Sequence, residues 1–182
     1  METIEVSRAE GVVTVTFNRP QVKNAVNATM WDELLATFRD VYDNPEDRVL
    51  VLTGAAGAFC SGADLSATRE GGREGLRSMR YVADVILTLH RLPKPTIAKV
   101  NGVAAGIGAN MALGCDLIVA GETARFSEIF IRRGLSLDGG GSWLLPRLVG
   151  LHKAKELAFF GDVISAQEAE RIGLVNHVVA DT

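Results

Sequence analysis

In the first third of the 182-residue chain, hydrophobic residues recur first with the period of a strand and then with the period of a helix. Residues 12–17 alternate apolar and polar side chains, which predicts a half-buried strand with residues 4–7 as its hairpin partner. From Asn27, a favourable N-cap, apolar residues recur every three or four positions until Asn44, which predicts a helix. Residues 49–53 are continuously apolar or β-branched, so we expect a central strand that is buried on both faces.

The same order of strand, loop and helix then returns. Residues 66–75 are polar and glycine-rich, which predicts a loop, and a second helix follows until about residue 92. Its apolar stripe consists of Leu76, Met79, Val82, Ala83, Ile86 and Leu89. Residues 96–100 and 117–120 are predicted strands, with a helix of small residues at 106–113 between them. The pattern predicts one α/β domain.

Beyond residue 126 the pattern becomes mainly helical. Two helices are expected at 140–149 and 152–160. Residues 165–168 read Ser-Ala-Gln-Glu, a capping box that opens a third helix, and Gly173 ends it before an apolar segment at 175–179. The chain therefore ends in a helical part.

Composition excludes several classes of protein. Hydrophobic residues make up 47% of the chain and charged residues 23%, so a disordered chain is excluded. A net charge of -3 provides no basic field for nucleic acid or anionic lipid. Two cysteines and three scattered histidines favour neither a disulfide framework nor a metal site. With no apolar leader and no uninterrupted apolar run, we expect a cytoplasmic protein without metal.

The chain has nineteen glycines, concentrated at 54–62, 102–114 and 134–141, but these clusters match no phosphate-binding motif. The spacing of Gly57 and Gly62 is that of a phosphate-binding loop, yet Asp64 stands where the phosphate-contacting residues should be. Gly106 begins a dinucleotide fingerprint, but Met111 replaces its third glycine. No GxSxG elbow is present. Nucleotide binding and triad hydrolysis are therefore disfavoured.

Two glycine-rich turns remain, at 58–65 and 100–108, and each follows a predicted strand. In an α/β fold such turns converge at the carboxyl ends of neighbouring strands. Small residues let backbone N–H groups approach a ligand oxygen closely, so the pair could form an oxyanion hole. The alternative is that the glycines only permit tight turns and close helix packing.

Four segments carry a resemblance to a known family: NRPQVKNAVN at 18–27, AFCSGADL at 58–65, PKPTIAKVNGVAAGIG at 93–108 and GDVISAQEAERIGLVNHVV at 161–179. In this order and spacing they resemble the enoyl-CoA hydratase/isomerase, or crotonase, superfamily. The resemblance covers essentially the whole chain, 1–182. It implies a spiral of ββα units, an acyl-CoA ligand, no cofactor beyond the CoA of the substrate, and trimers or dimers of trimers. The family's C-terminal helices are expected to be absent after residue 182.

The resemblance also implies the residues of the site. The backbone N–H groups of Ala63 and Ile107 would stabilise a thioester enolate, and Phe130 would lie beside the substrate. CoA would be bordered by Lys23, Ala25, Ala63, Asp64, Leu65 and Ser66. For Lys23, a solvated lysine in a turn is an equal alternative.

The chain departs from the hydratase pattern at both catalytic glutamates. Asn110 and Phe130 occupy their positions, and neither side chain can accept a proton from water. Glu128 lies two residues from the second position, and we expect it at the surface. Some members of the family are dehalogenases, but the histidine and tryptophan that assist them are missing near Ala83 and at Phe130. His90 is expected to be a structural or interface residue.

Asp138 stands where dienoyl-CoA isomerases and ring-modifying isomerases of this family carry an aspartate. One carboxylate suffices for isomerisation, because it can remove a proton from one carbon and return it to another. Phe130, Leu137 and Trp143 are expected to raise the pKa of Asp138. The alternative role for Asp138 is N-cap of the helix ending at Val149. We therefore hypothesise an enoyl-CoA isomerase with Asp138 as base; a hydratase relying on Glu128 or a bound water, and a non-catalytic acyl-CoA carrier, remain alternatives.

Overall fold

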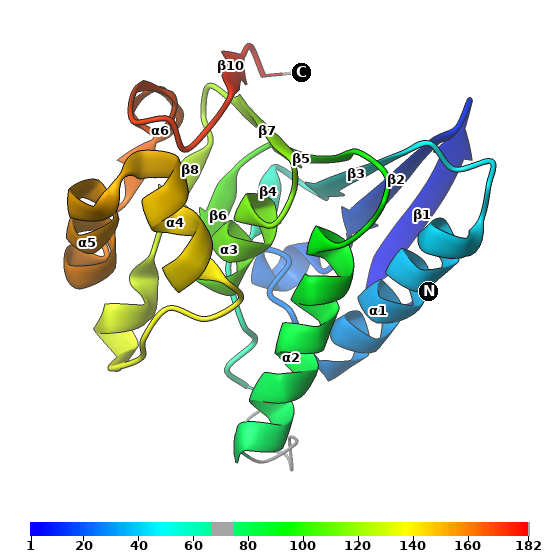
Figure 1. Ribbon diagram of the computed structural model, residues 1–182, viewed down its shortest axis with the longest axis horizontal. Coiled ribbons are helices and arrows are strands. Elements are labelled where there is room, and N and C mark those ends of the chain that lie inside the picture. The colour runs from blue at the N-terminus through cyan, green and yellow to red at the C-terminus, as the bar shows by residue number, and fades with distance from the viewer. Residues whose placement is uncertain (67–74, 182) are drawn as a thin grey trace.

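The largest element of the fold is a six-stranded sheet. A computed structural model describes residues 1–66 and 75–181, and the side chains of residues 75 and 76 lie outside that description. The strands in spatial order are β1 (Ile4–Ala9), β2 (Val12–Phe17), β3 (Val49–Gly54), β5 (Thr96–Val100), β7 (Leu117–Gly121) and β10 (His177–Val179). β1 and β2 form the predicted antiparallel hairpin, and each later neighbour pairs in parallel (Figure 1).

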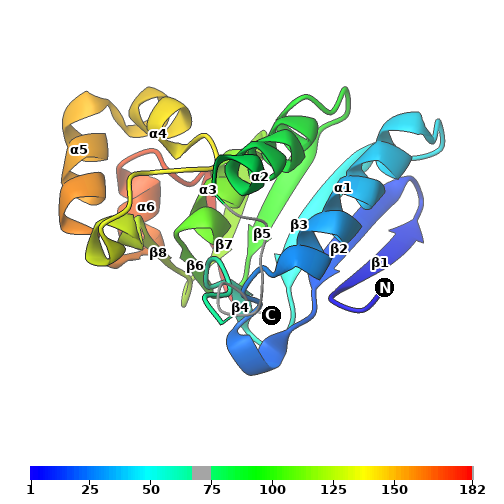
Figure 2. The ribbon, with the colours of Figure 1, turned by 90° about the horizontal axis from the view of Figure 1, so that it is seen from below.

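Two long helices lie on the same side of this sheet, as Figure 2 shows. α1 (Ala28–Asp43) begins where the sequence predicts, because the Asn27 side chain accepts a hydrogen bond from the Met30 N–H at 2.9 Å. α2 (Gly75–His90) buries Ile86 and Leu89 of the expected stripe. Val85 is buried as well, whereas Met79 is 48% exposed and faces a pocket instead of the core. Most of the loop predicted at 66–75 lies outside the described residues.

β3 is central in the sheet, as predicted, but the expectation that both its faces are buried is wrong. Leu50 and Leu52 are fully buried, while Val49, Val51 and Thr53 are only partly buried. The two helices cover one face of the strand, so alternate residues keep some exposure.

A second, four-stranded sheet was not predicted. It contains, in spatial order, β4 (Ala58–Cys60), β6 (Val103–Ala105), β8 (Arg125–Ser127) and β9 (Ile164–Ser165). Each strand has two or three residues, too few to show a period of two. β4 and β6 pair in parallel, and α3 (Ile107–Leu113), whose residues are all buried, begins directly beyond β6.

The helical end of the chain agrees with the prediction. It comprises the 3-10 helix η3 (Ile129–Arg133), α4 (Gly141–Val149), α5 (Leu151–Phe160) and α6 (Ala166–Arg171), grouped on one side in Figure 1. A further short 3-10 helix, η1 (Pro20–Val22), precedes α1. Ser165 caps α6 by accepting a hydrogen bond from the Glu168 N–H. His90 packs edge-on against Trp143, with 5.8 Å between ring centroids. None of the described helices combines the length and apolarity needed to cross a membrane.

Candidate functional site

The two glycine-rich turns lie against each other, as the sequence predicts. Gly62 has a φ of +113° and Gly106 a φ of +53° with ψ of -127°, conformations that side chains disfavour. A Cβ on Gly108 would lie 2.3 Å from the Cys60 carbonyl oxygen, so α3 touches the end of β4 directly. Close backbone packing and the turn conformations therefore both require glycine here.

Each turn presents a backbone N–H group without an acceptor among the described residues. Ile107 is the first residue of α3, so its N–H has no carbonyl within the helix to bond. The N–H of Ala63 lies in an isolated bridge to Val26, in which only the flanking groups bond: Val26 donates to Gly62, and Asp64 donates to Val26, both at 2.8 Å. These two N–H groups can therefore donate to a ligand.

The segment predicted to border CoA packs directly on the Ala63 turn. The Ser61 N–H donates to the carbonyl of Lys23 at 3.0 Å, and the Ser61 hydroxyl donates to that of Val22. Lys23 has a φ of +50° and an exposed side chain, while Ala25 is buried. The structure thus brings the two predicted CoA-bordering segments together.

Asp64 is held by internal contacts instead of facing solvent. Its carboxylate accepts hydrogen bonds from the N–H and hydroxyl of Ser66, and it forms an ion pair with Arg19 at 2.8 Å. These contacts, led by the Ser66 hydroxyl, hold the pKa of Asp64 below its usual value. Arg19 also donates to the Ala25 carbonyl at 2.6 Å, so it ties both segments together. Leu65, in contrast, is half exposed.

Replacing Arg19 with methionine should lower the free energy of unfolding by about 1–3 kcal/mol, because it leaves the largely buried Asp64 carboxylate without its cation. Chemical denaturation at pH 7 measures the change. Arg39→Met, at an exposed position of α1, is the matched control and should change stability by less than about 0.5 kcal/mol. Equal losses in both variants would show that the ion pair does not stabilise the turn.

Asp138 does not cap a helix, so that alternative is wrong. The N-cap of α4 is Gly140, and no side chain caps this end. Asp138 instead lines a pocket of about 430 Å³ together with Met79, Val82 and Ala83 of α2 and other residues of 135–139. Burial raises the pKa of Asp138 to about 6, and its Oδ1 atom has no hydrogen-bond partner among the described residues.

The Asp138 loop also lies against the start of α3. A Cβ on Gly139 would come within 2.3 Å of the Ile107 side chain. Asn110 donates from Nδ2 to the Asp138 carbonyl at 2.8 Å, which fixes this loop over the helix. Phe130 is buried, with its ring beside Gly106. Trp143, expected next to Asp138, instead contacts His90 and Arg147.

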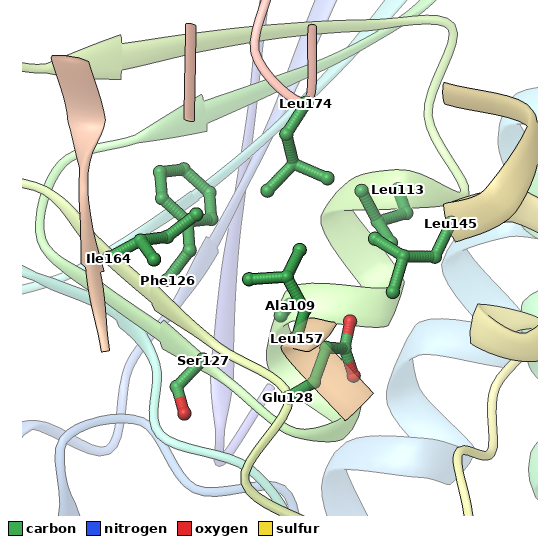
Figure 3. Close-up of a pocket in the computed structure, with 9 residues that line it drawn as sticks. All are labelled: Ala109, Leu113, Phe126, Ser127, Glu128, Leu145, Leu157, Ile164 and Leu174. Carbon is green, nitrogen blue, oxygen red and sulfur yellow. The ribbon is translucent and has the colours of Figure 1, made fainter. Parts of the chain in front are cut away.

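Glu128 is buried, and the surface position expected for it is wrong. Only 4% of the residue is exposed, and Figure 3 shows its carboxylate among apolar side chains, whereas the Ser127 hydroxyl points away. Burial, and after it the negative charge of Asp138, raises the pKa of Glu128 to about 8, although the Asn110 amide acts in the opposite direction. Its burial could have been predicted from its position in the sequence, between Phe126 and the apolar pair at 129–130.

The comparisons with known proteins agree with this geometry. Residues 7–182 match the family described as enoyl-CoA hydratase/isomerase. The chain belongs to this family. A probable enoyl-CoA hydratase of Rhodobacter capsulatus is 42% identical over 98% of this chain and 69% of its own length. The 1,2-epoxyphenylacetyl-CoA isomerase of Escherichia coli is 40% identical over the whole of this chain and 71% of its own.

Solved structures of the enoyl-CoA hydratase/isomerase family share the fold. The crystal structure of an enoyl-CoA hydratase from Bacillus anthracis superimposes with a TM-score of 0.93 at 35% identity, over 98% of this chain and 70% of that one. The predicted α/β crotonase fold with a helical C-terminal part is therefore confirmed. No group of three or more histidine, cysteine or acidic side chains in the described ranges is arranged to hold a metal ion.

Proposed function

We propose that this member of the enoyl-CoA hydratase/isomerase family shifts a double bond in an unsaturated or cyclic acyl-CoA, with Asp138 as the base. The observation that carries the proposal is the Asp138 carboxylate, which lines the 430 Å³ pocket with one oxygen unpaired among the described residues and a raised pKa. The two positions where hydratases carry glutamates hold a loop-fixing amide, Asn110, and a buried ring, Phe130.

The chemistry needs one base and two N–H donors. The ionised Asp138 removes a proton from an acyl-chain carbon next to the double bond. The electron pair left behind is delocalised onto the thioester oxygen, which gives an enolate. The N–H groups of Ala63 and Ile107 stabilise that developing negative charge, each by about 2.7–4 kcal/mol. The protonated Asp138 then returns the proton to a different carbon, so the mass of the substrate does not change.

CoA would lie along the segments that the structure brings together. The exposed Lys23 ammonium can contact a phosphate, and Ala25, Ala63, Leu65 and Ser66 border the pantetheine. The Asp64 carboxylate is engaged with Arg19 and Ser66 and its N–H with Val26, so its backbone carbonyl would face the ligand. No cofactor other than the CoA of the substrate takes part in this scheme.

Self-association is part of the proposal. Large apolar side chains are exposed on α4, α5 and the turn after α5: Trp143, Leu148, Leu151, Phe159, Phe160 and Val163. Exposed apolar side chains gathered on neighbouring elements are typical of protein interfaces. A trimer, or a dimer of trimers, is the assembly we propose.

Hydration is the second candidate function, favoured by the buried Glu128 carboxyl and by the hydratase names of several relatives. Supplying 2-enoyl-CoA and 3-enoyl-CoA separately, and following absorbance and mass, distinguishes the candidates. Isomerisation moves the double bond without a change of mass, while hydration adds one water. Tight binding without either product would identify an acyl-CoA carrier and contradict both enzymatic proposals.

A further inference from the structure

Three neighbouring residues near the candidate active site each have a buried side-chain oxygen atom without a hydrogen-bond partner among the described residues. Asn110 Oδ1, Glu128 Oε2 and Asp138 Oδ1 have no hydrogen-bond partner among the described residues. With both carboxyls ionised, all three atoms are acceptors and none is a donor. Leaving such atoms buried and unpaired is costly, so the cluster requires at least one additional proton or donor.

Asn110 interacts with both carboxyl-bearing residues, Glu128 and Asp138. It bonds the Asp138 backbone, and its amide also acts on the Glu128 carboxylate. A Cβ on Gly141 would lie 2.5 Å from both polar atoms of the Asn110 amide, so the start of α4 holds this side chain in place. The cluster is therefore built from α3, the loop before η3, and the loop before α4.

The two carboxyls face different spaces. Asp138 lines the open pocket beside α2. Glu128 lines a much smaller cavity of about 10 Å³ whose other walls are mostly aliphatic or aromatic, with Ala109, Leu145 and Leu157 among them (Figure 3). Substrate in the larger pocket can meet Asp138, while Glu128 is buried and does not line that pocket.

No described cation compensates Glu128. Asp138 is the one titratable group of the described residues that affects its pKa. Charged side chains of the surrounding elements are engaged elsewhere, in the pairs Arg132–Asp162, Lys153–Glu156 and Arg171–Glu168, in the Arg147–Trp143 stack, and in the Arg125 bonds to backbone carbonyls. Arg133, His152 and Lys155 are exposed. Two neighbouring carboxylates without a cation cannot both ionise readily in such an environment.

We propose that Glu128 is a positioning residue that retains a proton and so lets Asp138 alone carry the negative charge of the active site. A protonated Glu128 converts one of the three orphaned acceptors into a donor. It also keeps a second negative charge away from the enolate that forms in the pocket. The catalytic consequence rests on the proposed isomerase function, whereas the proton on Glu128 does not.

The pH profile of kcat/KM for isomerisation tests the catalytic consequence. The wild-type protein should be active while Asp138 is ionised and Glu128 is protonated, which gives a bell with limbs near pH 6 and pH 8. Glu128→Gln keeps the shape of the side chain but cannot ionise, so it should retain the acid limb and lose the alkaline one. Glu46→Gln, at an exposed loop position, should keep both limbs. An alkaline limb that persists unchanged in Glu128→Gln overturns the proposal.

Thermal unfolding between pH 5 and pH 9 tests the proton without any turnover. A carboxyl whose pKa is higher in the folded than in the unfolded state stabilises the fold at low pH and loses this effect as pH rises through the folded pKa. The wild-type Tm should therefore fall relative to that of Glu128→Gln from pH 5 upward and level off above about pH 8.

The negative charge of Asp138 raises the pKa of Glu128, and Asp138→Asn removes that charge. The pKa of Glu128 is then lower, so the fall in Tm should level off at a lower pH in Asp138→Asn than in the wild-type protein. A constant Tm difference between wild type and Glu128→Gln across the range would overturn the proposal. Failure of the isomerase assignment shows separately, as absent turnover of 3-enoyl-CoA by the wild-type protein.

Discussion

Asp138→Asn should lower kcat for double-bond isomerisation by about 10²- to 10⁴-fold, the range contributed by a positioned general base. The amide is nearly isosteric with the carboxylate but cannot accept a proton at neutral pH. Acyl-CoA affinity should change little, because the segments proposed to border CoA, at 23–25 and 63–66, do not include this loop. Turnover of 3-enoyl-CoA and calorimetric binding of an unreactive acyl-CoA give the two quantities separately.

Asp43→Asn is a suitable control for this variant, since Asp43 is an exposed residue at the end of α1. It should match the wild-type protein in both measurements. If Asp138→Asn turned over substrate at the wild-type rate, another group would be the base. If it lost binding and turnover together, Asp138 would be needed to shape the pocket, and the assignment as base would fail.

Gly108→Ala should abolish most activity and lower the free energy of unfolding by about 1–3 kcal/mol, the usual cost of overpacking. The new methyl group would lie 2.3 Å from the Cys60 carbonyl oxygen and 2.8 Å from its Sγ atom. Neither the strand end nor the helix start can accept this distance, so α3 must move away from β4. Ile107 and Ala63 belong to the two turns that separate, so their N–H groups stabilise the enolate less well. We therefore expect kcat to fall by about 10²- to 10³-fold.

Gly114→Ala provides the comparison at the other end of α3. Gly114 has helical φ and ψ, and its Cβ would lie 3.3 Å from the nearest atom, the Met111 carbonyl oxygen. This variant should keep nearly all activity, with a small change in Tm. Equal kcat values for the two variants, determined with unfolding curves on the same preparations, would show that the contact between the turns does not control the chemistry.

The long elements of the fold were predictable because their residues repeat a pattern over several turns. The stripe of α1 and its Asn27 cap, the β1–β2 hairpin and the Ser165 cap of α6 all occur as expected, although the Glu168 carboxylate pairs with Arg171 and does not complete the capping box. The spacing of apolar residues is sufficient to predict these elements, because an element that buries one face repeats apolar residues with the period of a helix or of a strand. The second sheet was missed because strands of two or three residues are determined by their neighbours and not by their own sequence.

The sequence by itself determined which groups are candidates for catalysis: two glycine turns with backbone donors, an aspartate at 138, and no glutamate at 110 or 130. It left the role of Asp138 open between base and cap, and the tertiary structure decided against the cap, since Gly140 takes that position.

Only the tertiary structure revealed the relation between Glu128 and Asp138. They lie ten positions apart in the chain, and neither spacing nor periodicity indicates that Asn110 lies close to both. Whether a carboxyl is charged depends on the atoms that exclude water from it and on the charges nearby. For Glu128 these are the apolar walls contributed by α3, α4 and α5 together with Asp138, which distant parts of the chain assemble.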